Sequence, residues 1–484
     1  MGNQPTDEKI FTTKSLIMEN KKKNYILFIA LSAALGGLLF GYDTAVISGA
    51  IGNLTEYFHL TPVETGWAIS SALVGCIIGA FISDYFSNRF GRKVTMLITA
   101  LLFILNSVGT ALPISFSMFV VFRIIGGIGV GIASMVVPMY IAEIAPPKRR
   151  GALVGNYQLA IVIGIVVVYF VNYFIALQGD SVWNLNIGWR WMFGSEIIPS
   201  ILFLIFIFLI PESPRWLFQK GKTAEAVGVL DKINSPEEVL QVQEEIENSI
   251  NVKEVNQWKN LVNPMFKKAL FVGIGLSVLQ QLTGINAILY YAPEIFKSLG
   301  SSTDVSLLET SILGVVNLIF TLLAIRFVDK MGRKPLLYIG SIGMTIALAA
   351  VGSFIYFEAI GNWVLPFLLL FMASFSISWG PIVWVLLSEI FPNKIRSLAL
   401  AISVFIQWVA NFVVTQVFPS LIENQWLKTH FNGAFPFICF QYYVFYLYYL
   451  FGEKFQKPKI KVWNKWIHYG NKENYNYSTF YDWI

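Results

Sequence analysis

Long apolar stretches alternate with short polar connections along almost the whole chain. A helix that crosses a bilayer needs roughly 20 largely apolar residues. Stretches of about that length begin near residues 25, 66, 94, 118, 152, 190, 268, 308, 335, 363, 397 and 435. The pattern predicts an all-α membrane protein with about twelve transmembrane helices.

One long polar segment interrupts this pattern between Pro211 and about Met265. Within it, Ala224 to Leu230 and Pro236 to Ile250 carry apolar residues at helical spacing among acidic ones, which predicts amphipathic surface helices. We therefore expect a linker between two six-helix bundles. The predicted division is an N-terminal tail (1–24), a first bundle (25–211), the linker (212–265), a second bundle with an atypical last helix (266–452) and an atypical polar tail (453–484).

Composition excludes a soluble globular domain, because 55% of the residues are hydrophobic, 13% are charged and the mean hydropathy is +0.61. The net charge of +6 is distributed by loop. Basic clusters such as Lys148-Arg149-Arg150 occupy alternate connections, whereas residues 51–64, 112–117 and 177–188 contain no lysine or arginine. The positive-inside rule then predicts that both termini and the linker lie in the cytoplasm. The expected location is the cell inner (plasma) membrane. A nucleic-acid partner is not expected.

A short basic phrase occurs twice and predicts an internal repeat. Asn88–Lys93 (NRFGRK) recurs as Lys330–Lys334 (KMGRK), and a glutamate seven residues before an arginine follows each copy at a similar offset. The two bundles are therefore expected to be pseudo-symmetric. We interpret the charges as ion pairs that latch the bundles together in one conformation, the alternative being charges that only set topology. The candidates are Asp84, Arg89, Arg92, Glu143, Arg150, Asp329, Arg333, Glu389 and Arg396.

Ionisable side chains within the spans are costly and therefore mark candidate functional sites. Asp43 lies in the first span, and Arg123 in the fourth is its expected partner. A carboxylate whose proton affinity depends on a nearby arginine can act as a proton switch. The alternative is a static buried ion pair. Glu196 in the sixth span is a second carboxylate, either a proton relay or an interfacial group.

Uncharged amides interrupt the seventh span in the run Gln280–Asn286 (QQLTGIN). They fit best around a helix that is broken at Gly284. Amides both donate and accept hydrogen bonds, as sugar hydroxyls do, and an indole can cover the apolar face of a sugar. The cluster therefore favours a site for a neutral polyol, although hydrogen bonding between helices is the alternative. Further candidates in other spans are Gln158, Asn317, Trp384 and Gln407.

Several classes of function lack sequence support. The two cysteines, Cys76 and Cys439, lie in apolar segments and give no disulfide framework or metal-binding spacing. No nucleophile–base pair and no phosphate-binding loop is apparent in the sequence. We therefore expect neither an enzyme nor an ATP-driven pump, and no cofactor.

These motifs together resemble the sugar porters of the major facilitator superfamily, and are most similar to the bacterial D-xylose–proton symporter type. The resemblance covers roughly residues 25 to 436. It rests on six ordered motifs besides the second GRK: Gly36–Gly49 (GGLLFGYDTAVISG), Arg89–Lys93 (RFGRK), Pro138–Gly151 (PMYIAEIAPPKRRG), Pro211–Trp216 (PESPRW), Gln280–Asn286 and Trp384–Arg396 (WVLLSEIFPNKIR).

The resemblance implies a twelve-helix fold that works by alternating access around a central site. It also implies proton coupling at Asp43 and Arg123, with Glu196 as a further participant; facilitative members tend to carry asparagine at the position of Asp43. The implied sugar contacts are Gln158, Gln280, Gln281, Asn286, Trp384 and Gln407, with Tyr290 and Asn317 close by.

Two departures from the family pattern bear on function. Ile165 stands where the xylose symporter that this chain resembles has glutamine. After Pro436 the family pattern is replaced by a sequence rich in tyrosine, lysine and asparagine, which we interpret as a reading-frame change. The leading hypothesis is a monomeric proton-coupled symporter of a small pentose or hexose, acting in a lipid bilayer. The alternatives are a facilitative uniporter, a transport-inactive sugar sensor, or an allele impaired by its C-terminus.

Overall fold

A computed structural model describes residues 7–146, 149–251, 264–357, 363–391 and 395–423 of the chain. The described residues form helices, and eleven of the helical segments are long and apolar enough to cross a membrane. The protein is thus an all-helical, multi-pass membrane protein. The expected twelfth span near residue 435 and the polar tail lie outside the described residues.

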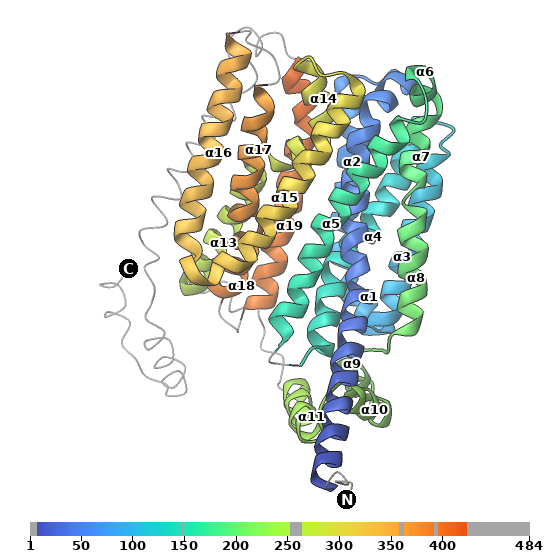
Figure 1. Cartoon of the computed structure of the whole chain (residues 1–484), viewed down its shortest axis with the longest axis vertical. Coiled ribbons are helices and arrows are strands. Elements are labelled where there is room, and N and C mark those ends of the chain that lie inside the picture. Colours follow the sequence, from blue (N-terminus) through green and yellow to red (C-terminus); the bar gives the residue numbers. More distant parts are fainter. Residues whose placement is uncertain (1–6, 147–148, 252–263, 358–362, 392–394, 424–484) are drawn as a thin grey trace, which may run out of the picture.

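The first half of the bundle contains six spans (Figure 1). The first helix begins at Asp7, well before its apolar part, so the segment expected as a polar tail continues the helix. The sixth span is assembled from four consecutive pieces. The elements are α1 (Asp7–Phe58), α2 (Pro62–Phe90), α3 (Arg92–Ala111), α4 (Phe116–Ile144), α5 (Arg150–Ala176), α6 (Ser181–Trp183), η2 (Asn184–Gly188), α7 (Trp189–Gly194) and α8 (Ile197–Leu209).

The linker is helical where the amphipathic pattern predicts it. It contains α9 (Pro214–Gln219), α10 (Thr223–Ile233) and α11 (Pro236–Asn251), which lie beside the N-terminal end of α1 (Figure 1). Lys22 of α1 donates a hydrogen bond of 2.5 Å to the carbonyl oxygen of Asn234, just after α10. The linker is thereby attached to the first half.

The second half of the bundle contains five described spans, two of which are broken helices. The break at Gly284 is the one that the sequence predicts, and this glycine has a φ of 83°, in the left-handed region that glycine tolerates. The break at Ser378 was not predicted. The elements are α13 (Pro264–Leu282), α14 (Ile285–Ser298), α15 (Thr303–Met331), α16 (Arg333–Tyr356), α17 (Val364–Ile377), α18 (Trp379–Ile390) and α19 (Arg396–Glu423).

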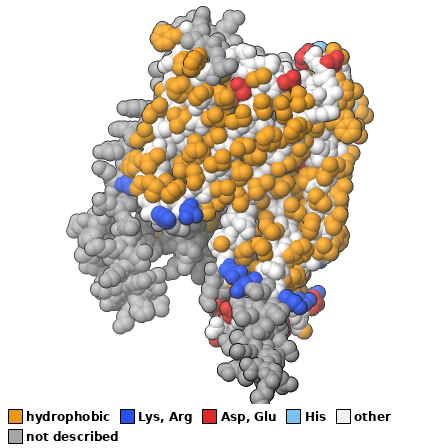
Figure 2. Space-filling view, viewed as in Figure 1, with side chains coloured by type: hydrophobic (Ala, Val, Ile, Leu, Met, Phe, Trp, Pro, Cys, Tyr) orange, Lys and Arg blue, Asp and Glu red, His pale blue; other side chains and the backbone are white. Residues whose placement is uncertain are grey.

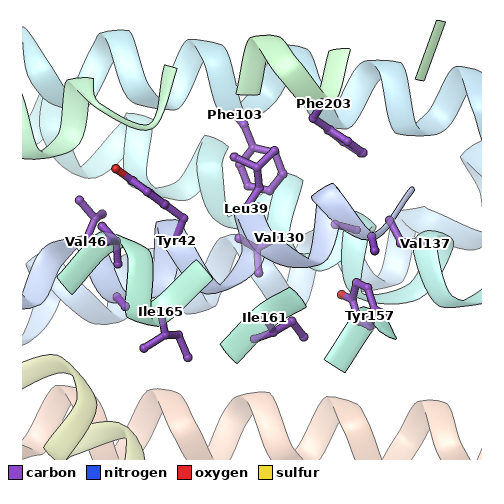
Figure 3. Close-up of a cluster of buried hydrophobic side chains, with 14 of the residues drawn as sticks. Leu39, Tyr42, Val46, Phe103, Val130, Val137, Tyr157, Ile161, Ile165 and Phe203 are labelled. Atoms are coloured by element: carbon purple, nitrogen blue, oxygen red, sulfur yellow. The ribbon is translucent and has the colours of Figure 1, made fainter. Parts of the chain in front are cut away.

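The buried apolar side chains form two clusters. One covers the first half and extends into the linker and into α14, α15 and α19, and the other lies within the second half. In the first half, Leu39, Phe103 and Val130 belong to a cluster of buried side chains contributed by α1, α3, α4, α5 and α8 (Figure 3). The second cluster includes Met344 and Phe371. Outside these cores, Figure 2 shows a broad band of apolar side chains on the visible face, with lysine and arginine at its lower edge. Such a band is expected of a surface that contacts lipid.

Glycines allow helices of the first half to approach closely. A Cβ atom at Gly127 of α4 would collide with the carbonyl oxygen of Ala72 on α2. In the same way, Gly164 of α5 lies against the backbone of α1 at Leu38. Small residues serve this purpose in membranes, where helix association depends on packing and hydrogen bonding.

The halves contact each other along α2 and α19, from Phe81–Phe405 to Trp67–Phe412, and are joined by hydrogen bonds toward the end of the molecule opposite the N-terminus. We call this the far end, and the end with the basic turns around Arg92 and Arg333 the basic end. At the far end, Gln416 of α19 hydrogen-bonds Ser70 Oγ (2.6 Å) and the Val63 carbonyl (2.9 Å) of α2. Tyr169 of α5 donates to the carbonyl of Leu289 on α14 (2.8 Å).

Candidate functional site

A buried ion pair lies in the middle of the first half. Arg123 Nη1 on α4 is 2.9 Å from Asp43 Oδ1 on α1, and both side chains are at most 1% exposed. The same guanidinium nitrogen also donates to the Asp43 carbonyl oxygen (3.2 Å). The pairing expected from the sequence is therefore present. Its role in proton coupling remains a prediction.

A third polar side chain joins this pair to Glu196. The amide nitrogen of Asn106 on α3 donates to Asp43 Oδ1 (2.7 Å) and to Glu196 Oε2 (2.9 Å). Asn106 and Glu196 are fully buried. Glu196 stands at the N-terminus of α8, at a break in the sixth span. These contacts put the two membrane carboxylates, the arginine and the amide in one polar cluster, which we call the carboxylate cluster (Asp43, Asn106, Arg123, Glu196).

Four amides form a second buried network in the other half. Gln280 Oε1 accepts hydrogen bonds from Gln407 Nε2 (2.8 Å) and Gln281 Nε2 (3.3 Å). Asn286 beyond the helix break donates to Gln281 Oε1 (2.5 Å). Gln280 in turn donates to the carbonyl of Trp379 at the start of α18 (2.7 Å). The network therefore ties α13, α14, α18 and α19 together through one chain of amides.

The break at Gly284 makes this network possible. In a continuous helix, Gln281 and Asn286 do not share a face, because residues five apart are separated by well over one turn of 3.6 residues. Gly284 ends α13 and starts α14 in a new orientation, so the two amides meet. Asn286 is half-buried, and Gln407 Oε1 is buried without a hydrogen-bond partner among the described residues.

The remaining candidate sugar contacts occupy several helices. Asn317 of α15 accepts from Ser376 Oγ (2.8 Å), and Tyr290 of α14 is buried. Trp384 of α18 is 41% exposed. Gln158 of α5 is half-buried, and its side chain makes no hydrogen bond to another described residue. Gln158 thus comes from the first half and all the other candidates from the second.

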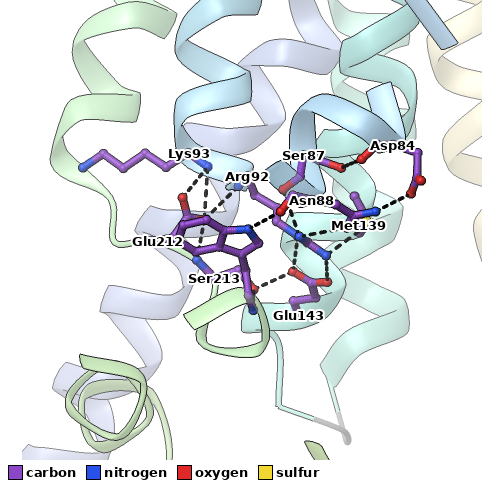
Figure 4. A network of polar contacts seen from close by, with 10 residues as sticks. Asp84, Ser87, Asn88, Arg92, Lys93, Met139, Glu143, Glu212 and Ser213 are labelled. Carbon is purple, nitrogen blue, oxygen red and sulfur yellow. Dashed lines mark hydrogen bonds and ion pairs between the residues drawn. The ribbon is translucent and has the colours of Figure 1, made fainter. Parts of the chain in front are cut away.

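At the basic end, the first copy of the repeated phrase belongs to a dense polar network (Figure 4). Arg92 donates through Nε and Nη2 to both carboxylate oxygens of Glu143, each at 2.9 Å. Ser213 donates from its hydroxyl to Glu143 Oε2 (2.5 Å). Glu212 accepts from the backbone N–H groups of Arg92 (2.9 Å) and Lys93 (3.2 Å), and so caps the N-terminus of α3.

The carboxyl group of Glu212 is titratable and lies outside the spans. Its pKa is raised above the usual value of 4.5, because burial penalises the charged form more than its neighbours stabilise it. The neighbours that oppose the shift are the backbone N–H groups of Ser213, Lys93 and Arg92 and the charge of Arg92. Neither Glu212 nor Ser213 was singled out from the sequence, although the motif that contains them was.

The second copy forms the equivalent pair in the other half. Arg333 Nη2 lies 2.8 Å from Glu389 Oε1, and this pair is more exposed than the first. We expected latches between the halves, whereas each of these two pairs joins helices of one half. Three of the other candidates have described side chains: Asp84 accepts a hydrogen bond from Asn88, Arg89 lies over the Phe90 ring, and Arg150 is the first residue of α5. The side chains of Asp329 and Arg396 lie outside the described part. A latching role for all nine remains a prediction.

Comparison with known proteins identifies the family to which this architecture belongs. The profile of the Sugar (and other) transporter family matches residues 29–455. The chain belongs to this family. A D-xylose-proton symporter of Escherichia coli is 48% identical over 442 residues, covering 86% of this chain and 89% of the relative. An arabinose-proton symporter of Bacillus subtilis is 40% identical over 449 residues, covering 92% and 96%.

A solved structure supports the same assignment. It is the xylose transporter of E. coli in a partially occluded inward open conformation, with a TM-score of 0.80 and 44% identity, covering 88% of this chain and 98% of that one. The resemblance drawn from the motifs is thereby confirmed, as is the major facilitator fold. The protein is a sugar transporter and not an enzyme.

For this sugar transporter, sequence reasoning missed one member of the carboxylate cluster. Asn106 lies in the third span between Leu105 and Ser107, and no motif marks it. The sequence feature that could have identified Asn106 was one amide side chain within an apolar span, and Gln158 and Asn317 were chosen for the same feature. Its importance depends on the two partners that the fold brings to it.

Proposed function

We propose that the protein carries one small neutral sugar, a pentose or hexose, together with a proton, by alternating access across the inner membrane. The observation that carries the proposal is the buried contact of Asp43 with Arg123, at 2.9 Å between side chains. A carboxylate beside an arginine remains ionised, and when the two separate in a buried site it binds a proton. Asp43 therefore has the chemistry of a proton carrier.

The arrangement of polar groups supports a division of labour between the halves. The carboxylate cluster lies in the first half, and the amide network of Gln280, Gln281, Asn286 and Gln407 lies in the second. Amides match the donors and acceptors of sugar hydroxyls without requiring a charge on the substrate. We propose that these four amides, with Gln158, Tyr290, Asn317 and Trp384, contact the sugar.

The names of the relatives favour a pentose. The two relatives compared above are named as proton symporters of D-xylose and of arabinose. Ile165 of α5 weakens a specific claim for xylose over glucose, because it is a buried apolar side chain where the xylose symporter type has glutamine and offers no hydrogen bond to a sugar hydroxyl. We therefore propose a xylose-like pentose as the first substrate to test, with glucose and galactose as competitors.

The decisive variant is Asp43→Asn, which keeps the size of the side chain and removes its titration. Addition of sugar to a weakly buffered suspension of cells with the wild-type protein should raise the external pH. The variant should abolish this signal and concentrative uptake, while counterflow exchange of labelled sugar survives. Glu309→Gln is the matched control, because Glu309 is also a buried carboxylate but accepts from Ser301 at the far end of the second half. It should retain the signal.

Facilitated diffusion is the second candidate function. It predicts sugar entry without a change in external pH in the wild type, and Asp43→Asn would then leave net uptake intact. A panel of labelled sugars in the same assay ranks the substrates. Absence of any sugar flux in either assay would contradict transport and support a sensor or an impaired allele.

A further inference from the structure

Asn106 lies between two carboxylates in the membrane, and its one amide NH₂ group donates hydrogen bonds to both. The two hydrogen atoms of an NH₂ group allow two donated bonds. One goes to Asp43 Oδ1 (2.7 Å) and the other to Glu196 Oε2 (2.9 Å). The three side chains come from α1, α3 and the start of α8, and each is fully buried. Asn106 is therefore the direct connection between the two acids.

The charges of the cluster balance only if one proton is bound. Arg123 supplies one positive charge, and it pairs with Asp43. If Asp43 and Glu196 were both ionised, one negative charge would be buried with no cation to balance it, which is costly. Asp43 Oδ2 and Glu196 Oε1 are buried and accept no hydrogen bond from the residues that the structure describes. Either oxygen can take a proton without breaking an existing contact.

The position of Asn106 is fixed by its surroundings. A Cβ atom at Gly126 of α4 would collide with the Asn106 side chain, so the amide fills the space that this glycine leaves. The neighbouring Ser107 donates to the carbonyls of Phe193 (2.9 Å) and Gly194 (3.2 Å), just before Glu196. These contacts hold α3 against the break in the sixth span.

From this geometry we propose that Asn106 is a positioning residue for proton coupling. It holds Asp43 and Glu196 as one unit that binds a single proton per sugar, and its two donated hydrogen bonds favour release of that proton. The inference rests on the proposed symport. The other ionisable groups around the unit are Arg123 (α4), Tyr42 (α1), Cys76 (α2) and Tyr290 (α14).

The test is the pH dependence of sugar uptake into proteoliposomes that have the same pH on both sides and a fixed membrane potential. Asn106→Leu keeps the approximate size of the side chain and removes both donors. Hydrogen bonds to a carboxylate favour its charged form, so their loss should move the pH of half-maximal uptake upward by about one unit. Asn106→Ser, with one hydroxyl donor, should give a smaller shift in the same direction.

Ser107→Ala is the matched control, because it removes the neighbouring hydrogen bonds from α3 to α7 of the sixth span without touching a carboxylate. It should leave the pH of half-maximal uptake unchanged. Counterflow exchange, which needs no net proton movement, reports whether each variant is folded and binds sugar. If Asn106→Leu does not fold, Asn106→Ser carries the test.

The outcomes separate this inference from the proposed function. An unchanged pH of half-maximal uptake in an Asn106 variant with normal counterflow would overturn the inference and leave symport intact. An equal shift in Ser107→Ala would also overturn it, because the effect would then be one of helix packing. A wild type that moves sugar without protons would instead overturn the proposed function.

Discussion

At the scale of single residues, each buried acid discussed above is held by hydrogen bonds and an ion pair to specific partners. Asp43 has Arg123 and Asn106, and Glu143 has Arg92 and Ser213. The two carboxylates, although each is paired with an arginine, lie in different environments. Asp43 lies inside a span, where separation from its partner changes its proton affinity. Glu143 lies at the basic end, where a bidentate arginine contact favours a fixed geometry.

Glu212 gives a prediction about stability and pH. Its folded-state pKa is raised, so the folded protein binds the proton more tightly than the unfolded chain, and protonation stabilises the fold. This contribution is present below the usual pKa of 4.5 and is lost as the pH rises through the folded-state value. Glu212→Gln cannot titrate. The melting temperature of the wild type minus that of Glu212→Gln should therefore increase as the pH falls from about 7 toward 4.5.

The measurement is thermal unfolding of both proteins in one detergent across that pH range. Ser298→Ala provides the control, because it removes one hydrogen bond within α14 and no titratable group. Its difference from the wild type should stay nearly constant. A Glu212 difference that is flat or decreases on acidification would contradict the assignment.

At the scale of elements, packing of helices depends on small residues and on breaks. Gly127 lets α4 touch the backbone of α2, and Gly164 does the same for α5 and α1. The left-handed Gly284 breaks the seventh span and brings Asn286 to Gln281. These positions decide which polar side chains meet. The apolar residues around them decide only that the helices are in the membrane.

The close approach of α2 and α4 predicts a difference between two glycine substitutions. Gly127→Ala puts a methyl group against the carbonyl of Ala72 and should destabilise the protein by about 1–3 kcal/mol. Gly155→Ala on α5 adds the same group where nothing lies within 4 Å. It should be neutral or slightly stabilising, because alanine favours the helix. Melting temperatures in detergent compare them, and equal effects would contradict the packing argument.

At the scale of the whole molecule, the halves are fastened at the far end. Gln416 links α19 to α2, Tyr169 links α5 to α14, and Gly52 of α1 lies against Glu294 of α14. In contrast, the ion pairs Arg92–Glu143 and Arg333–Glu389 at the basic end each lie within one half. Contacts of this kind suit a conformation that is closed at the far end.

Gln416→Leu tests this fastening. The substitution removes both hydrogen bonds from α19 to α2, worth roughly 1 kcal/mol each, and should shift the population toward forms open at the far end several-fold. Distances between spin labels at Glu56 and Thr303, which are exposed on the two halves, report the change. Ser298→Ala is a control that removes a hydrogen bond within α14 only. An unchanged distance distribution in Gln416→Leu would contradict the role.

The sequence by itself determined the eleven spans of the described residues, the basic side of the loops, the break at Gly284 and the pairing of Asp43 with Arg123. Each of these follows from local properties: apolar length, charge, a glycine among amides, or a charge that must find a partner in lipid. Apolar length gives the number of spans but not their arrangement, so the break at Ser378 and the multi-part sixth span escaped prediction.

Only the tertiary structure decided which polar groups share a site. Asn106 is 63 residues from Asp43 and 90 from Glu196 in sequence, and no local pattern records either contact. Glu212 is 120 residues from the Arg92 backbone that it caps. Such contacts depend on which helix faces meet, and those faces are set by the packing of the whole bundle.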